Sequence, residues 1–195
     1  MSEKLNRALE EAGKIHGLSI GMLVSHTGRD ALLIVSLISI LPFMQPIPVP
    51  GLSTILGFII FLQGVALVFK GEPLLSEKMR EIKISSELFR LIRGAFIRVS
   101  WITSRISNFK HPWAKSYPSR VLCGIAIMTS AAFLSLPLPI PFSNFIPALA
   151  IFMICAGLLE EDLMLILLGQ GINLVIIWIA MLSAQMIREV FQNYF

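Results

Sequence analysis

The sequence has little charge. Lys, Arg, Asp and Glu together make up 14% of its 195 residues, whereas a soluble domain carries about 25%. Hydrophobic residues make up 55%, and the mean hydropathy is +0.79. In a water-soluble fold, that apolar excess would be left on the surface as large patches, which soluble monomers rarely carry. The shortage of charge therefore excludes a disordered chain, a coiled coil and a nucleic-acid-binding module of the usual sort, and it predicts a membrane protein.

Reactive residues and targeting signals are also scarce. The two cysteines, Cys123 and Cys155, lie inside apolar runs, so we expect small buried side chains and no disulfide framework. No spacing fits a metal site, a phosphate-binding loop or a nucleophile elbow. The first 30 residues are polar or amphipathic and do not look like a cleavable signal peptide. We therefore expect no cofactor, no metal, no catalytic residues and no enzymatic activity.

The basic residues are unevenly placed. Residues 70–120 hold eleven Lys and Arg against four Glu, the N-terminal tail is balanced, and Arg188 is the only basic residue after that block. Positively charged segments of membrane proteins stay on the cytoplasmic side. We therefore predict a multi-pass membrane protein, with the tail and the middle block in the cytoplasm and the lipid bilayer, not nucleic acid, as its partner.

The middle block is amphipathic. Its apolar residues follow a helical spacing, and its basic residues lie largely off that stripe; we assign to the membrane surface Arg90, Arg93, Arg98 and Arg105. This pattern favours a helix lying in the plane of the membrane surface. The alternative is a basic helix that docks on a partner protein.

Five apolar runs account for the hydrophobic excess, and they cover residues 31–43, 52–69, 121–136, 142–159 and 163–187. Only the last is long enough to be an unambiguous membrane span, which takes about 20 residues. The other four form two pairs, and each pair is interrupted by three alternating prolines that a helix interior does not tolerate.

The two pairs are related by a shift of 91 residues, which places Pro46, Pro48 and Pro50 on the prolines of the segment 137–141. We therefore predict an all-α membrane protein built from two repeats of helix, proline break and helix, followed by a transmembrane helix. The predicted single domain consists of a tail (1–29), repeat 1 (30–70), a basic linker (71–119), repeat 2 (120–162) and the final helix (163–187).

Two topologies satisfy the charge distribution equally. Each proline segment is either a periplasmic turn between two full spans or the tip of a re-entrant hairpin. The run 31–43 reaches only about 20 Å as a helix, whereas the hydrocarbon core is about 30 Å thick. We therefore favour re-entrant hairpins whose tips bury against each other.

The proline segments also carry the first candidate site. Paired interruptions in two halves of a membrane protein point to a binding site, and the N-termini of the helices that follow attract anions. We assign to an anionic group, such as a sugar phosphate or a lipid phosphate, the residues Gly51, Ser53, Thr54, Ser143 and Asn144. The alternative is that the polar side chains merely cap their helices.

The acidic turn is the second candidate site. Glu160, Glu161 and Asp162 lie between two apolar runs and form either a proton- or cation-binding cluster or a solvated turn. In the final run, Gln170 and Asn173 lie three residues apart on one helix face, and we expect them to join helices.

These segments resemble a known family. Pro46-Ile47-Pro48-Val49-Pro50-Gly51-Leu52-Ser53 resembles the first signature of the ExoD family of bacterial exopolysaccharide-synthesis proteins, and Leu136-Pro137-Leu138-Pro139-Ile140-Pro141-Phe142 resembles the second. Gly157-Leu158-Leu159-Glu160-Glu161-Asp162 is similar to the acidic turn that follows. The resemblance implies an inner-membrane protein connected with exopolysaccharide production, and it implies no catalytic residues.

Three functions follow as hypotheses. The leading one is a protein that handles or transports a polysaccharide precursor or its anionic lipid carrier and works as a homo-oligomer, a dimer first. The second is an ion- or proton-coupled transporter that uses the acidic turn. The third is a scaffold that recruits synthesis enzymes through the basic linker.

Overall fold

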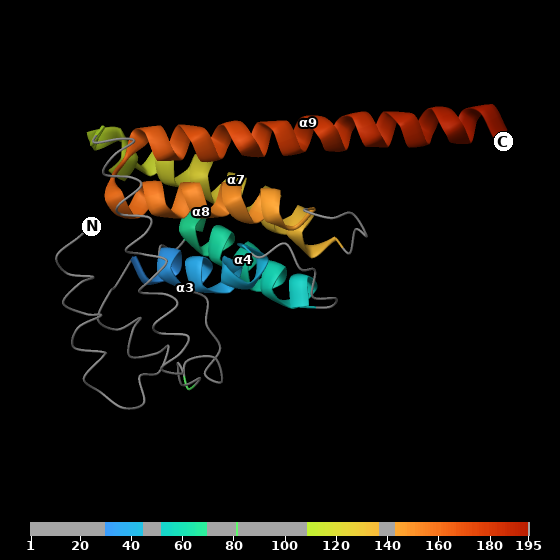
Figure 1. The fold of residues 1–195 in the computed structure, drawn as a ribbon. Helices are drawn as coiled ribbons and strands as arrows, with labels where there is room; N and C mark the ends of the chain where they lie inside the picture. Colours follow the sequence, from blue (N-terminus) through green and yellow to red (C-terminus); the bar gives the residue numbers. More distant parts are fainter. Residues whose placement is uncertain (1–29, 45–51, 70–80, 82–108, 137–142, 195) are drawn as a thin grey trace.

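The computed structural model describes residues 30–44, 52–69, 81, 109–136 and 143–194. Within these ranges the chain is almost entirely helical (Figure 1). The helices are α3 (Asp30–Ile40), η1 (Leu41–Met44), α4 (Leu52–Phe69), η2 (Pro112–Lys115), α7 (Tyr117–Ser135), α8 (Phe145–Glu160) and α9 (Leu163–Tyr194). The all-α architecture predicted from the sequence is therefore confirmed for the described part of the chain.

The ends of the helices lie within three residues of the ends of the apolar runs, except at two places. Helix α4 has the bounds of its run, but α7 begins four residues before the run that predicts it. The hydroxyl of Ser116 accepts a hydrogen bond from the amide of Ser119 (3.3 Å), and Pro118 occupies the first turn, where the N–H that it lacks would have no helical partner. These two residues start the helix inside the basic block.

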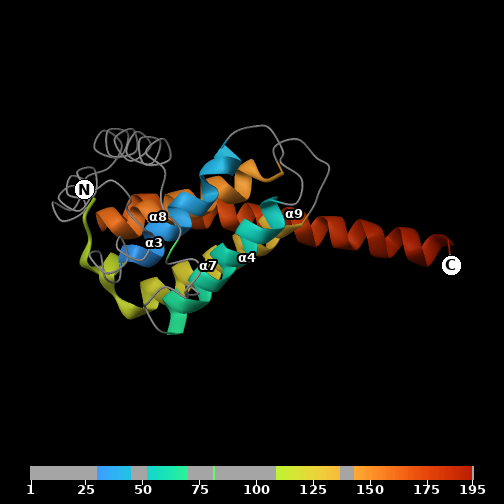
Figure 2. The ribbon, with the colours of Figure 1, turned by 90° about the horizontal axis from the view of Figure 1, so that it is seen from below.

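The second difference concerns α9, which we expected to end at residue 187 and which continues to Tyr194. Its C-terminal part extends well beyond the other helices (Figures 1 and 2). At 1.5 Å per residue, the 32 residues of α9 span about 48 Å. Its apolar part, Leu163–Leu182, accounts for about 30 Å of this length and matches the thickness of a bilayer core.

Glycines allow the helices to approach one another closely. At Gly57 and Gly64 of α4 and at Gly124 of α7, an added Cβ would come within 3.0 Å of an atom of the facing helix. The same holds between α8 and α9 at Gly157 and Gly169. Small residues at helix contacts are typical of membrane bundles, where close van der Waals packing takes the place of the hydrophobic effect. The pairs α4–α7 and α8–α9 are the most extensive contacts of the bundle.

The remaining contacts tie these pairs together. Helix α3 packs against α4 and α8, and α7 packs against α8 and α9. The core between them is aliphatic, with Ile40, Ile60 and Ile151 fully buried. Cys123 and Cys155 are also fully buried and unbonded to each other, as predicted for small core side chains.

Within the described ranges, two helices are long and apolar enough to cross a membrane, namely Tyr117–Ser135 and Leu163–Leu182. Three shorter apolar helices accompany them, at Leu32–Met44, Ser53–Phe69 and Phe145–Glu160. Many large apolar side chains point away from the bundle; Trp178, for example, is 62% exposed. A bundle that is apolar inside and outside fits a lipid environment. Both proline segments and most of the basic linker lie outside the described residues, so the repeat and the re-entrant hairpins stay predictions.

Candidate functional site

The helices that follow the two proline segments begin at the same end of the bundle. In both views, the N-termini of α4 and α8 lie at the end where α7 finishes (Figures 1 and 2). The first turns of two helices, each with amide groups that have no helical acceptor, are therefore on one side of the molecule. We call this the proline-loop end, and it is formed among the described residues by the first turns of α4 and α8 and the last turn of α7.

At the start of α4, the two predicted site residues Ser53 and Thr54 differ in solvent exposure. Ser53 is buried, at 4% exposure, whereas Thr54 is exposed. The Thr54 hydroxyl donates a hydrogen bond to the carbonyl oxygen of Ser135 (3.3 Å), which is the last residue of α7. Thr54 thus joins the beginning of one helix to the end of another. The third residue predicted here, Gly51, lies outside the described part of the chain.

At the start of α8, Ser143 and Asn144 are both half-buried. Asn144 has helical backbone angles (φ −85°, ψ −26°), and its side chain makes no capping hydrogen bond to α8. Asn and Ser are favoured at helix N-termini because their side chains usually accept such a bond. Asn144 therefore does not cap α8 through its side chain, whereas for Ser53 and Ser143 the capping alternative stays a prediction.

The acidic turn has a defined structural role at the opposite end of the bundle. Glu161 adopts a left-handed conformation (φ 60°, ψ 28°) directly after the last residue of α8. The backbone amides of Glu161 and Asp162 both donate to the carbonyl oxygen of Gly157, and these hydrogen bonds terminate the helix. Asp162 is 3% exposed, and its Oδ1 accepts hydrogen bonds from the amides of Met164 (2.9 Å) and Leu165 (3.3 Å). Asp162 therefore caps the N-terminus of α9.

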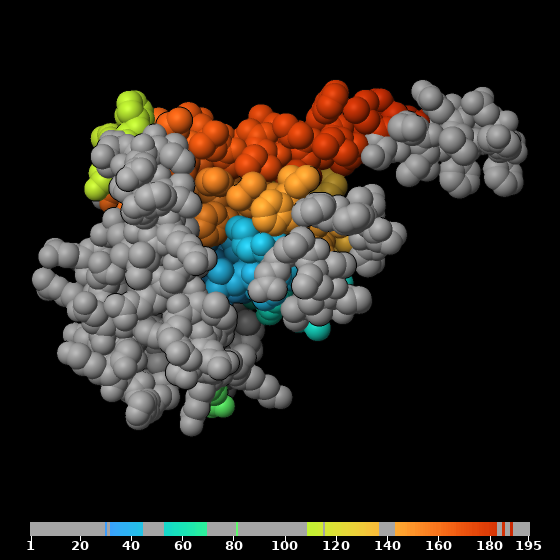
Figure 3. Space-filling view, in the orientation of Figure 1, coloured from blue at the N-terminus to red at the C-terminus, as the bar shows by residue number. Residues whose placement is uncertain are grey.

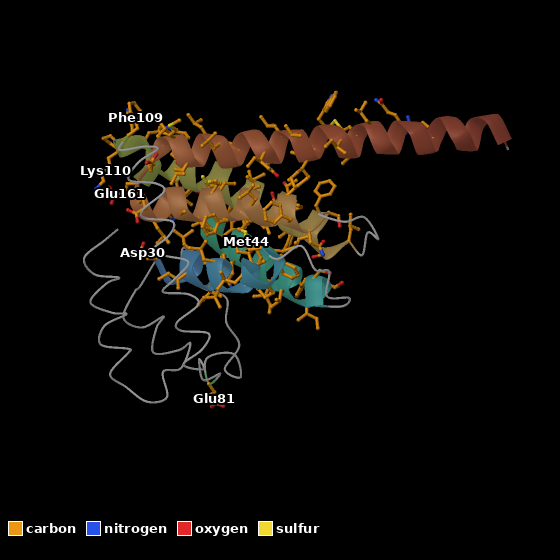
Figure 4. The ribbon with its side chains drawn as sticks, viewed as in Figure 1. Asp30, Met44, Glu81, Phe109, Lys110 and Glu161 are labelled. Atoms are coloured by element: carbon orange, nitrogen blue, oxygen red, sulfur yellow. The ribbon has the colours of Figure 1, made fainter. Side chains whose placement is uncertain are left out.

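A short backbone pairing attaches the end of the linker to this turn. The amide of Leu163 donates to the carbonyl oxygen of Phe109 (3.2 Å), and the amide of His111 donates to that of Glu161 (3.3 Å). Lys110 and Asp162 form the antiparallel bridge between these bonds. Figure 4 shows Phe109, Lys110 and Glu161 together where α8 ends and α9 begins. Sequence reasoning missed this contact because backbone groups, which every residue carries, make it.

Polar side chains also connect α7 to α9 inside the bundle. The hydroxyl of Ser130 donates to Oδ1 of Asn173 (2.9 Å), and both residues are buried. Nε2 of Gln170 lies 3.9 Å from the sulfur of Cys123. The prediction that Gln170 and Asn173 join helices is therefore confirmed.

Other predicted sites lie elsewhere. The membrane-surface residues Arg90, Arg93, Arg98 and Arg105 are outside the described residues, so their assignment stays a prediction. Among the residues that are described, no group of three His, Cys, Asp or Glu side chains is arranged to hold a metal ion. Among the described residues, the proline-loop end brings two helix N-termini to one side of the molecule, with Thr54 at the start of α4 and Asn144 at the start of α8.

Comparison with known proteins gives the family. The sequence model of a family described as "Exopolysaccharide synthesis, ExoD" matches residues 1–182. Protein ExoD of Rhizobium meliloti is 26% identical over 152 residues, which cover 74% of this chain and 61% of that protein. An uncharacterized protein of Synechocystis sp. is 34% identical over 136 residues, covering 66% of this chain and 61% of that protein.

The chain spans about three fifths of the length of these curated relatives. No solved structure matches it. Because the family model covers almost the whole chain, the resemblance seen in the proline motifs is confirmed. The chain belongs to the ExoD family, which is named for exopolysaccharide synthesis.

Proposed function

We propose that this protein takes part in exopolysaccharide synthesis by binding the anionic headgroup of a lipid-linked sugar precursor at its proline-loop end. The observation that carries the proposal is the common location of the N-termini of α4 and α8 (Figures 1 and 2). Helix N-termini present unsatisfied amides and a positive dipole end, and phosphate groups bind at such places in many proteins. Membership of a family named for exopolysaccharide synthesis supplies the substrate class.

The polar side chains at this end support the proposal. The side chain of Asn144 is not held in place by a capping bond to α8, so its NH2 group can turn toward a ligand oxygen and donate to it. Thr54 is exposed, and its hydroxyl donates its one proton to the carbonyl oxygen of Ser135 (3.3 Å), so it would have to turn away from that oxygen to bind an anion. Groups of this kind orient an anion without adding a charge of their own, which suits a site at the edge of a membrane.

The position of the site along the membrane also supports a lipid ligand. The hydrogen bond between Ser130 and Asn173 fixes the register of α7 against α9. Since both helices rise by 1.5 Å per residue, the last turn of α7 lies near the level of Trp178, close to the point where the apolar part of α9 ends at Leu182. If α7 and α9 both cross the membrane, this register puts the proline-loop end near the headgroup level, and that position supports a lipid phosphate as the ligand.

The acidic turn is a weaker candidate for a transport site. The carboxylate of Asp162 is occupied with the amides of Met164 and Leu165. A capping carboxylate stabilises the helix that it begins, which accounts for its burial without a transported ion. We therefore prefer the precursor-binding function to an ion-coupled one.

The test is a pair of substitutions at Asn144 in cells that make exopolysaccharide with this chain as the sole copy. Asn144→Asp adds a negative charge at a helix N-terminus, which is favourable for folding but repels an anionic ligand. We expect polymer output to fall at least tenfold for Asn144→Asp and less for Asn144→Ala, at equal protein levels.

A matched control is Ser36→Ala, which removes a buried hydroxyl of α3 that bonds within its own helix to the carbonyl oxygen of Leu32. We expect this variant to keep full polymer output. Unchanged output from Asn144→Asp together with Ser53→Ala would show that these residues are not part of a ligand site and would overturn the proposal.

A further inference from the structure

One face of α9 is apolar and faces away from every described helix. Its large exposed side chains run from the first turn of α9 to the end of its apolar part and include Met164, Leu167, Leu168, Leu174, Val175, Trp178, Ile179, Met181 and Leu182. No Asp, Glu, Lys or Arg occurs between residues 163 and 187. In Figure 3 the orange and red atoms of α9 form the upper edge of the molecule. We call this surface the outer face of α9.

A glycine lies in the middle of this face. Gly171 is exposed and lies in a shallow apolar hollow lined by Met164, Leu167, Leu168, Ile172 and Val175. Nothing lies within 4 Å of the place where its Cβ would be. The other five glycines in the described helices, by contrast, all have an atom of another helix within 3.0 Å of that place. Gly171 is thus the one described glycine whose missing side chain the fold of a single chain does not use.

A second glycine of α9, Gly169, shows that a missing side chain allows another helix to come close. Gly169 allows α8 to approach α9, because its added Cβ would lie 2.6 Å from Cγ1 of Ile154. Two residues along a helix correspond to about 200° of rotation, so Gly171 points in nearly the opposite direction. Helix α9 therefore carries a glycine on each of two opposite faces, and only Gly169 is in close contact with another described helix.

We propose that the outer face of α9 packs against the same face of a second copy, with the two Gly171 residues at the crossing point. Lipid chains are flexible and fill a groove without needing a glycine, whereas two helix backbones come close only where side chains are small. Copies inserted in one membrane share their orientation and depth. A two-fold axis along the membrane normal then places the hollows of the two copies opposite each other. The larger side chains beside Gly171 of one copy fill the hollow of the other copy.

Cysteine cross-linking in membranes tests the contact. In full-length chains with Cys123→Ala and Cys155→Ala, a cysteine introduced by Gly171→Cys should give a covalent dimer under mild oxidation. The matched control is Ile125→Cys, which replaces an exposed apolar residue of α7, a helix that crosses the membrane beside α9. We expect at least fivefold less cross-linked dimer from this control. Equal yields at the two positions would mean random collision and would overturn the proposal.

A second variant separates dimerisation from folding. Gly171→Leu fills the hollow with a side chain that meets nothing in the single chain, so the fold should be retained. We expect energy transfer between labelled copies in vesicles to fall at least fivefold, with the helical circular-dichroism signal unchanged. If the wild-type chain is monomeric in vesicles, or if Gly171→Leu leaves the transfer unchanged, the outer face of α9 contacts lipid and not a second copy.

Discussion

Asp162 shows how a single residue of the acidic turn is used. Two of the three acidic residues finish α8, and the third begins α9, so the turn is both the end of one helix and the start of the next. Asp162 accepts hydrogen bonds from the amides of two residues in the first turn of α9 while it is almost fully buried. Asparagine caps helices about as well as aspartate, so substitutions separate the capping role from a role of the charge.

We expect Asp162→Ala to lower the free energy of unfolding by about 1 kcal/mol, because it leaves helix amides without an acceptor. Asp162→Asn should keep most of the stability and full polymer output. The measurement is unfolding of the purified chain in detergent micelles, followed by circular dichroism. An Asn variant that folds normally but yields no polymer would instead support an ion- or proton-coupled function for the carboxylate.

The pair formed by Ser130 and Asn173 is the second residue-scale test, since it joins α7 to α9 across the bundle interior. A double-mutant cycle with Ser130→Ala and Asn173→Ala should give a coupling energy of about 0.6 kcal/mol, with roughly 1.7 kcal/mol as the upper end for such bonds in membranes. Unfolding in micelles measures the four stabilities. Additive effects of the two substitutions would mean that this hydrogen bond does not stabilise the bundle.

At the scale of elements, the contact between α4 and α7 depends on small residues. Gly64 and Gly124 face each other, and an added Cβ at either would lie 3.0 Å from the carbonyl oxygen of the other. Backbone atoms cannot move aside as a flexible side chain can, so a larger residue must push the helices apart. Overpacking of this kind typically costs about 1–3 kcal/mol.

We therefore expect Gly124→Leu to destabilise the chain by at least about 2 kcal/mol, measured as a lower midpoint of unfolding in micelles. The control is Ala132→Leu, which makes the same helix larger at an exposed position and should leave the midpoint almost unchanged. If both variants unfold like the wild type, the close approach of α4 and α7 does not contribute to stability.

The elements also show what a sequence reveals of such a fold. The bounds of α4 match those of its apolar run, because the sequence stays largely apolar from one end of the helix to the other. The start of α7 is less visible, since it lies among polar residues and depends on a cap at Ser116. The pairing of residues 109–111 with 161–163 leaves no pattern at all, because backbone atoms make it.

The candidate site was also predictable only in part. The proline motifs predict which residues begin the helices after each break, and Thr54 and Asn144 lie there. Sequence alone assigns a capping role to Asn144 as readily as a binding role, because the oxygen that caps a helix and the NH2 group that donates to an anion belong to the same side chain. Only the backbone and hydrogen-bond geometry distinguishes them, and that geometry depends on tertiary packing.

At the scale of the whole molecule, the register of α7 against α9 bears on the topology. The 19 residues of α7 span about 28 Å, nearly the thickness of a bilayer core. With Ser130 bonded to Asn173, α7 and the apolar part of α9 cover nearly the same depth. The sequence favours re-entrant hairpins because the run 31–43 is short, but this register favours a full crossing of the membrane by α7.

We therefore expect cysteines introduced at Val49 and Ile140 to react with a membrane-impermeant reagent added from the periplasmic side. Both positions belong to the proline segments, next to helix ends that share one end of the bundle (Figure 1). Labelling of intact cells, compared with lysed cells, measures their access, and Lys110→Cys at the opposite end of the bundle should react only after lysis.

Protection of Val49→Cys and Ile140→Cys in both conditions would place the tips inside the bilayer and would restore the re-entrant arrangement. The proposed ligand site would then lie at mid-membrane instead of at the headgroup level.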